Sequence, residues 1–257
     1  MPTFHRDGAT IAYEVHGRGF PVLLFAPGGL RSRMEMWHAP AGGPPRSWND
    51  WTQVLSGGVL GTTYTVVAMD QRNAGASRAP IKADHGWHTY AADHLALMDH
   101  LGHQRFHTLG GCIGGSFCLK ICELAPERNT AAVLQNPIGF HPEHPRYFPD
   151  GFADWAKEQH AARADLDAAA VQAFGRNMWS GPNSDFVYSV SRDFARRCTV
   201  PCLVLPGDDI PHPAVTGAEL ARVLPNVEQL KDWKGPLHLD AQRRAVVEFL
   251  ARHTPAA

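Results

Sequence analysis

Short apolar runs alternate with helical patterns along most of this chain. The runs are continuously apolar, and they lie at Val22–Ala26, Tyr64–Met69, Ala131–Leu134 and Val200–Leu205. A strand that is apolar on both sides belongs inside a sheet that is covered on both faces. The helical patterns between the runs fit crossover helices that join parallel strands. We therefore predict an α/β fold, with a mainly parallel central sheet and helices on both of its faces.

The alternation of strand and helix breaks between residues 137 and 197. This stretch is polar, with aromatic residues interleaved, and it carries helical signals at 153–175. We interpret it as a small helical cap that is inserted between two strands. A chain of 257 residues is within the size of one domain, so we predict a single domain over 1–257 with the cap at 137–197.

Charge and residue usage narrow the classes of partner and cofactor. The formal net charge of −1 provides no field that would recruit nucleic acid or an anionic membrane. The first residues do not resemble a secretory signal, and no apolar run approaches the roughly 18 residues of a membrane span. We expect a cytoplasmic protein that acts on a small molecule. The sequence leaves the oligomeric state open.

Cysteine and histidine are the residue types that would reveal a metal site. Four of the five cysteines lie in apolar contexts, where we expect small buried hydrophobic side chains in a reduced cell compartment: Cys118, Cys122, Cys198 and Cys202. The fifteen histidines are scattered, and no His–Cys or His–Glu spacing matches a zinc site. We predict neither a metal nor a cofactor.

The segment Gly110-Gly111-Cys112-Ile113-Gly114 carries the strongest chemical signal. It follows a predicted strand at 106–109 and precedes a predicted helix that continues to Ala125. Glycines allow the tight turn that lifts a nucleophile to the start of a helix. The free N–H groups and the positive dipole end of that helix favour a thiolate. We predict that Cys112 is a nucleophile.

This turn and other landmarks resemble the α/β-hydrolase superfamily over nearly the full length of the chain. The other landmarks are Pro27-Gly28-Gly29 and the turn Asp70-x-Arg72 with Gly75 and Ser77, in which Asn73 stands where the family usually has glycine. The turn with a cysteine at its centre, Gly110–Gly114, is similar to the nucleophile turn of dienelactone hydrolases and of the much longer polyhydroxyalkanoate synthases. The resemblance implies a hydrolase that cleaves an ester, lactone or thioester of a small molecule through a covalent acyl-enzyme.

The family order of nucleophile, acid and histidine gives candidates for the remaining catalytic groups. Asp209 follows the strand that ends at residue 205 and is the candidate acid, with Asp208 as the alternative. His238 is the first histidine after the last predicted strand, near 227–233, and is the candidate base. His212 is its rival. A Cys-His-Asp triad of this kind would carry nucleophilic acyl transfer.

Two further groups of residues are candidates for contact with the substrate. The backbone N–H groups of Ile113 and Gly29 are expected to form the oxyanion hole. Arg31, Trp37 and His38 lie in a long loop over this end of the sheet, where an arginine could hold a substrate carboxylate.

Two alternative functions fit the same landmarks. In the first, the acyl group passes from a carrier thioester to an acceptor other than water, as in an acyltransferase or a cyclase. In the second, the chain is a ligand-binding protein on a hydrolase scaffold and Cys112 is inert, because a fold does not by itself imply an activity.

Overall fold

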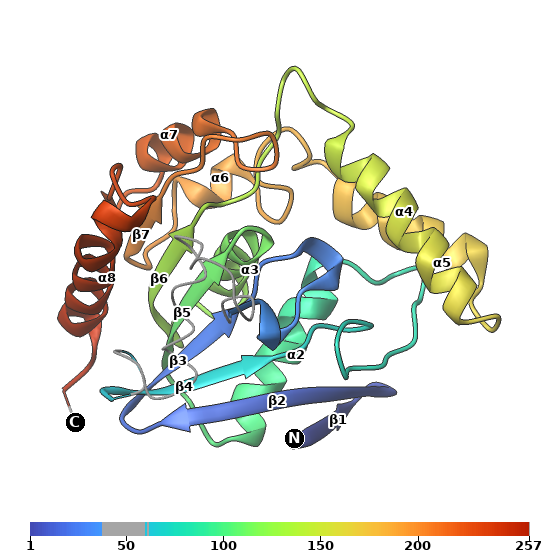
Figure 1. Cartoon of the computed structure of the whole chain (residues 1–257), viewed down its shortest axis with the longest axis horizontal. Helices are drawn as coiled ribbons and strands as arrows, with labels where there is room; N and C mark the ends of the chain where they lie inside the picture. The colour runs from blue at the N-terminus through green and yellow to red at the C-terminus, as the bar shows by residue number, and fades with distance from the viewer. Residues whose placement is uncertain (38–59, 61, 257) are drawn as a thin grey trace.

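The computed structural model describes residues 1–37, 60 and 62–256. Within these residues, eight strands form one sheet in the order β1-β2-β4-β3-β5-β6-β7-β8 (Figure 1). The strands are β1 (Thr3–Arg6), β2 (Ala9–Gly17), β3 (Phe20–Phe25), β4 (Tyr64–Met69), β5 (Phe106–Gly111), β6 (Asn129–Gln135), β7 (Cys202–Leu205) and β8 (Val227–Gln229). β2 runs antiparallel to β1 and β4, and all the pairs from β4 to β8 are parallel. The predicted α/β fold with a mainly parallel sheet is confirmed.

Helices cover both faces of this sheet. The α-helices are α2 (Trp87–His100), α3 (Ile113–Leu124), α4 (Tyr147–Ala162), α5 (Ala168–Trp179), α6 (Arg192–Ala195), α7 (Ala214–Val223) and α8 (Leu239–His253). Three short 3-10 helices are η1 (Gly29–Arg31), η2 (Met34–Trp37) and η3 (Pro236–His238). In the part of the chain that the structure describes, none of the helices combines the length and the apolar character that a bilayer span requires.

The sheet separates two apolar cores because successive side chains of a strand point to opposite faces. Leu23 and Phe25 of β3 pack with α2 and α3 on one face. Val22 and Leu24 of the same strand pack on the other face, where Phe249 of α8 joins them. The continuous apolar runs in the sequence thus arise from strands that are buried on both sides.

The chain between β6 and β7 carries α4, α5 and α6. Figure 1 shows α4 and α5 beyond the carboxyl ends of the strands, on the side where β5 passes into α3. In parallel α/β sheets, ligands bind at the carboxyl ends of the strands. This part of the chain therefore forms one wall of any site at that edge.

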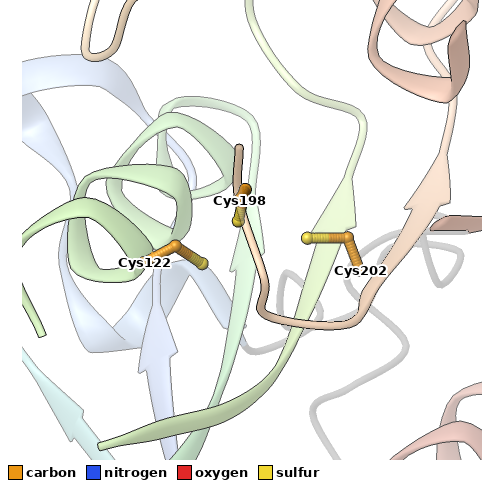
Figure 2. A group of neighbouring side chains, drawn as sticks. All are labelled: Cys122, Cys198 and Cys202. Atoms are coloured by element: carbon orange, nitrogen blue, oxygen red, sulfur yellow. The ribbon is translucent and has the colours of Figure 1, made fainter. Parts of the chain in front are cut away.

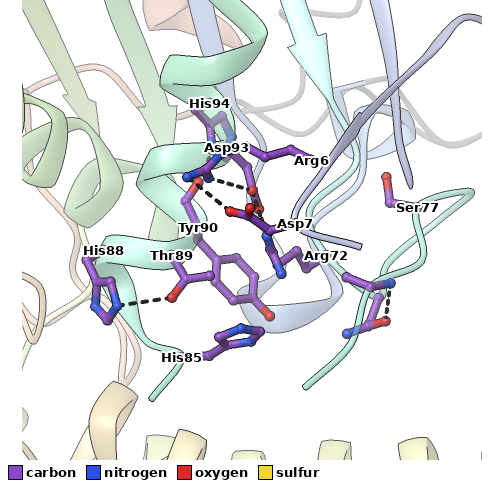
Figure 3. A network of polar contacts seen from close by, with 12 residues as sticks. Arg6, Asp7, Arg72, Ser77, His85, His88, Thr89, Tyr90, Asp93 and His94 are labelled. Atoms are coloured by element: carbon purple, nitrogen blue, oxygen red, sulfur yellow. Dashed lines mark hydrogen bonds and ion pairs between the residues drawn. The ribbon is translucent and has the colours of Figure 1, made fainter. Parts of the chain in front are cut away.

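A buried ion pair fixes the turn that follows β4 (Figure 3). Arg72 donates through Nε to Asp93 Oδ2 and through Nη2 to Asp93 Oδ1 at 2.9 Å, and Arg6 donates to the same Oδ1 at 3.1 Å. The side chains of Arg72 and Asp93 are 1% and 0% exposed. Burial opposes the charge on Arg72, but the Asp93 carboxylate raises the pKa of this guanidinium above its ordinary value. The pair ties the turn after β4 to α2.

Replacing Asp93 with asparagine is expected to lower the free energy of unfolding by about 3–5 kcal/mol, because it leaves the Arg72 charge buried without its counterion. Urea denaturation measures the change. The matched control is Asp150→Asn, which breaks the exposed Arg146–Asp150 pair and should cost about 1 kcal/mol or less. Equal losses in the two variants would show that the buried pair does not hold the turn.

Candidate active site

Cys112 occupies a strained turn between β5 and α3. Its backbone has φ 58 and ψ −121, in the left-handed region that side chains other than glycine rarely adopt. The turn is also tightly packed, since a Cβ on Gly110 would lie 2.2 Å from the carbonyl of Gly114. A Cβ on Gly114 would lie 2.2 Å from the carbonyl oxygen of Phe25. These contacts explain the two glycines and hold the cysteine, which is partly buried, at the head of α3.

The loop between β7 and α7 supplies a histidine and a carboxylate. The backbone N–H of His212 donates to Asp209 Oδ1 at 3.0 Å, and His212 Nδ1 lies 2.6 Å from the same oxygen. A carboxylate at Nδ1 favours the tautomer with its proton on that nitrogen and leaves Nε2 as the acceptor. Nε2 is buried and makes no hydrogen bond among the described residues. It is the ring nitrogen left for the interaction with Cys112.

The interaction between Cys112 and His212 favours their charged forms. Burial opposes ionisation of the thiol, but the adjacent His212 ring and the backbone N–H groups of Gly28 and Ile113 hold the pKa of Cys112 below its ordinary value. Burial likewise opposes a charged imidazole, yet Cys112 and Asp209 raise the pKa of His212. The two shifts together favour a thiolate beside an imidazolium, which is the reactive form of a catalytic cysteine.

A cavity of about 540 Å³ opens beside Cys112. Cys112 and His212 line it together, and the rest of its wall is largely apolar and aromatic: Leu30, Tyr147, Phe148, Phe152, Trp155 and Trp179. This volume suits a small molecule, and the wall offers mainly apolar contacts.

Asn136 and Tyr147 are polar residues of this cavity that were not found from the sequence. Asn136 is 5% exposed, has φ 51, and its Oδ1 has no hydrogen-bond partner among the described residues. Tyr147 begins α4, and burial together with the negative charges of Cys112 and Asp209 raises the pKa of its hydroxyl. Neither belongs to a local sequence pattern, so only the packing of α4 and of the turn after β6 reveals them.

Comparison with known proteins identifies the family. The sequence model of the alpha/beta hydrolase fold matches residues 21–181. The chain belongs to the α/β-hydrolase family. A relative from Pseudomonas savastanoi pv. phaseolicola, named "Putative carbamate hydrolase RutD", is 29% identical over 209 residues, which are 72% of this α/β hydrolase and 79% of the relative.

Solved structures show the same α/β-hydrolase fold. The enol-lactonase from Burkholderia xenovorans LB400 has a TM-score of 0.65 at 20% identity, over 97% of this chain and 100% of that one. A meta-cleavage product hydrolase from Pseudomonas fluorescens IP01 has a TM-score of 0.66 at 18% identity, over 99% of this chain and 98% of that one. At these identities the likeness establishes the fold and not the substrate.

The structure separates the two candidate acids of this α/β hydrolase. Asp209 contacts the His212 ring, as described above. Asp208 instead pairs with Lys234, and its side chain is 72% exposed. Adjacent residues in this turn thus face different partners, and Asp209 is the one that reaches a histidine beside the nucleophile.

The structure does not bring His238 to Cys112, which corrects the expectation from the sequence. His238 ends η3 and precedes α8, it is absent from the cavity wall, and its neighbour Leu237 is 93% exposed. β8 ends at Gln229, and the chain beyond it places Trp233 inside the protein, where the indole N–H donates to the Pro206 carbonyl at 2.8 Å. His238 is half-buried and lies outside the cavity wall, and His212 is the histidine beside Cys112.

Two turns present backbone N–H groups near the nucleophile. The N–H groups that act on the Cys112 sulfur belong to Ile113 and Gly28, and the expected oxyanion hole of Ile113 and Gly29 stays a prediction. Gly29 lines the cavity, and its carbonyl accepts hydrogen bonds from the N–H and the hydroxyl of Ser32 at 3.2 and 2.7 Å. The sequence could locate this glycine turn but not the direction in which each of its N–H groups points.

The three predicted substrate contacts have different outcomes. Arg31 lines the cavity, but Glu158 of α4 takes up its guanidinium in two hydrogen bonds of 2.9 and 2.7 Å. Trp37 is fully buried in the core on the α8 side and does not line the cavity, which corrects the expectation for it. His38 lies outside the described residues.

Proposed function

We propose that this α/β hydrolase cleaves an ester, a lactone or a thioester of a small molecule through a covalent Cys112 acyl-enzyme. His212 is the proposed base, and Asp209 orients it. The observation that carries this proposal is the position of Cys112. A strained turn holds it at the head of α3, where it shares a cavity wall with His212, and Nδ1 of His212 contacts the carboxylate of Asp209. These are the parts that nucleophilic acyl transfer requires.

The proposed reaction has two halves. His212 takes the Cys112 proton, the thiolate attacks the substrate carbonyl, and the developing oxyanion accepts hydrogen bonds from the N–H of Ile113 and from the Gly28-Gly29 turn, which lines the cavity. The tetrahedral intermediate collapses, His212 protonates the departing oxygen or sulfur, and a thioester remains on Cys112. Water then gives a proton to His212 and attacks the thioester. Acid is released, and the proton returns to the thiolate.

The lining of the cavity supports a neutral substrate with an apolar acyl group. Aromatic side chains of α4 and α5 form much of its wall, and the charge of Arg31 is already paired with Glu158. Asp154 lines the same cavity, and its carboxylate would repel an anion, whereas the carboxylate of Asp150 is paired with Arg146. A substrate carboxylate held by Arg31, which the sequence suggested, is therefore no part of this proposal.

The names of similar proteins widen the range of bonds that this protein is proposed to cleave. One relative is named as a carbamate hydrolase and one solved structure as an enol-lactonase. Carbamates, lactones and esters all present a carbonyl carbon bonded to a leaving heteroatom, so one thiolate and one pair of N–H donors serve each of them. A screen should include all three classes.

Mixing the protein with a p-nitrophenyl ester of a short acyl chain is expected to yield a burst of nitrophenol and one acyl group bound at Cys112. Quenching in acid and measuring the intact mass, followed by peptide mapping, locates the adduct. The thiol of Cys118, which is buried near the same helix start, provides the internal comparison and should stay unmodified.

The covalent thiol mechanism would be ruled out by two results together. Product would form with no adduct on Cys112, and protein alkylated at this residue would keep full turnover. An adduct that persists in water but clears on addition of an alcohol or a thiol would instead favour acyl transfer. Saturable binding without any turnover would favour the ligand-binding alternative.

A further inference from the structure

Three cysteines converge at a second place in the fold, away from the cavity. Their sulfur atoms all lie within 4.8 Å of one another. Figure 2 shows Cys122 on α3, Cys202 on β7 and Cys198 on the segment before β7, with the three thiols directed toward a common point. Cys122 is ten residues along α3 from the nucleophile, which corresponds to roughly 15 Å at 1.5 Å per residue.

We propose that these three thiols form a binding site for a soft divalent d10 cation, namely Zn²⁺ or its heavier congener Cd²⁺. Thiolate is the ligand type that selects such ions, and three of these ligands from separate segments are brought together here. A metal–sulfur bond of about 2.3 Å requires sulfur atoms roughly 4 Å apart in a trigonal or tetrahedral site. The present separations need only a small contraction, which side-chain rotation can supply.

Polar groups already surround the sulfurs. Asn129 Nδ2 donates to Cys122 Sγ at 3.3 Å, and Thr108 holds the same amide by a second hydrogen bond at 3.1 Å. The thiols of Cys202 and Cys198 lie 3.4 and 3.9 Å from the carbonyl oxygen of Val200. On metal binding the three thiols release their protons, the amide keeps its bond to a thiolate, and this carbonyl is left beside the ion for a fourth position.

Charge and burial are consistent with a divalent ion. Three thiolates and one divalent cation carry a net charge of −1. A monovalent cation in the same site would leave a larger negative charge. The three cysteines are at most 2% exposed, so this charge must be stabilised by donors such as Asn129. Cys198 has exposed neighbours on both sides, Arg197 and Thr199, and local opening of this turn gives the ion access.

Packing alone does not account for the arrangement. Buried cysteines commonly act as small hydrophobic residues, and Cys118 does so on the same helix without joining the group. A purely hydrophobic role explains neither why three sulfur atoms converge nor why an amide N–H donates to one of them. A bound ion would join α3, which presents Cys112, to β7, whose following loop presents Asp209 and His212.

Titration of the reduced Cys112→Ser protein with Cd²⁺ under anaerobic conditions tests this site without interference from the cavity cysteine. We expect an ultraviolet thiolate-to-cadmium charge-transfer band that saturates at one equivalent. Cys198→Ser and Cys202→Ser, each in the same background, should lose the band. Cys118→Ser is the matched control, since it removes a buried thiol from the same helix, and it should keep the band at full intensity.

A measurement on the Cys112→Ser protein alone keeps the test independent of whether the other variants fold. X-ray absorption of its zinc-loaded form should show three sulfur ligands. Zinc bound mainly by oxygen or nitrogen, no uptake of Cd²⁺, or equal loss of the band in Cys118→Ser would overturn the proposal. So would fewer than four free thiols in that protein after denaturation without reductant, because the site needs its cysteines reduced.

Discussion

Replacing Cys112 with alanine is expected to lower kcat/KM for an activated ester by about 10³-fold or more. The variant keeps the turn, the cavity and the N–H donors of Gly28 and Ile113, but it has no atom that can form the acyl-enzyme. The remaining activity should equal what the donors and substrate binding supply alone. Steady-state hydrolysis of the p-nitrophenyl esters and lactones measures the loss, and circular dichroism confirms that the variant is folded.

Cys112→Ser sharpens this prediction, because it keeps a hydroxyl at the same strained position. A hydroxyl ionises far less readily than a thiol, and the site favours a thiolate beside His212, so we expect a large loss here too. Cys118→Ser is the matched control and should leave turnover within about twofold, since this residue lies outside the cavity wall. Full turnover by Cys112→Ser would mean that the reaction does not depend on a thiol.

Apolar runs located the inner strands well, and they were less reliable at the strand ends. β4 spans the predicted Tyr64–Met69 because every side chain in it except Thr65 belongs to one of the two cores. β5 continues to Gly111 through its pairing with β6, which glycines do not signal. β8 stops at Gln229, short of Trp233, because the indole packs as a core residue without belonging to a strand.

Edge and surface elements carried weaker signals. β1 is a four-residue edge strand with mixed polarity, and α6 is a single helical turn. Neither has enough residues to establish a periodic pattern, so their positions depend on contacts that form only in the folded chain.

The nucleophile and the base differ in what the sequence can say about them. Cys112 is placed by a local rule, since glycines on either side of a residue between strand and helix dictate a sharp turn. The choice between His212 and His238 depends on how the chain after β8 packs. Trp233 is buried and donates to the Pro206 carbonyl, and His238 lies outside the cavity wall. That outcome is a matter of tertiary packing and has no local pattern.

His212→Ala is expected to lower kcat/KM by about 10²–10⁴-fold, whereas His238→Ala should leave it within about twofold. The first variant removes the group that takes and returns the proton, and the second removes a ring that does not line the cavity. The two substitutions are chemically identical, so the pair tests position alone. If His238→Ala lost more activity than His212→Ala, the base would be His238, and the chain after β8 would have to move to bring it to Cys112.

The pH dependence of alkylation at Cys112 separates a proton-transfer role from a structural one. His212 and the two backbone donors lower the pKa of the thiol, so the thiolate persists below the ordinary thiol pKa and is lost as the pH falls through the lowered value. In His212→Ala the imidazole that lowers this pKa is gone while burial remains, and burial favours the neutral thiol. The midpoint of iodoacetamide labelling should therefore move to higher pH in His212→Ala and stay in place in His238→Ala. An unchanged midpoint in both would show that the imidazole does not act on the sulfur.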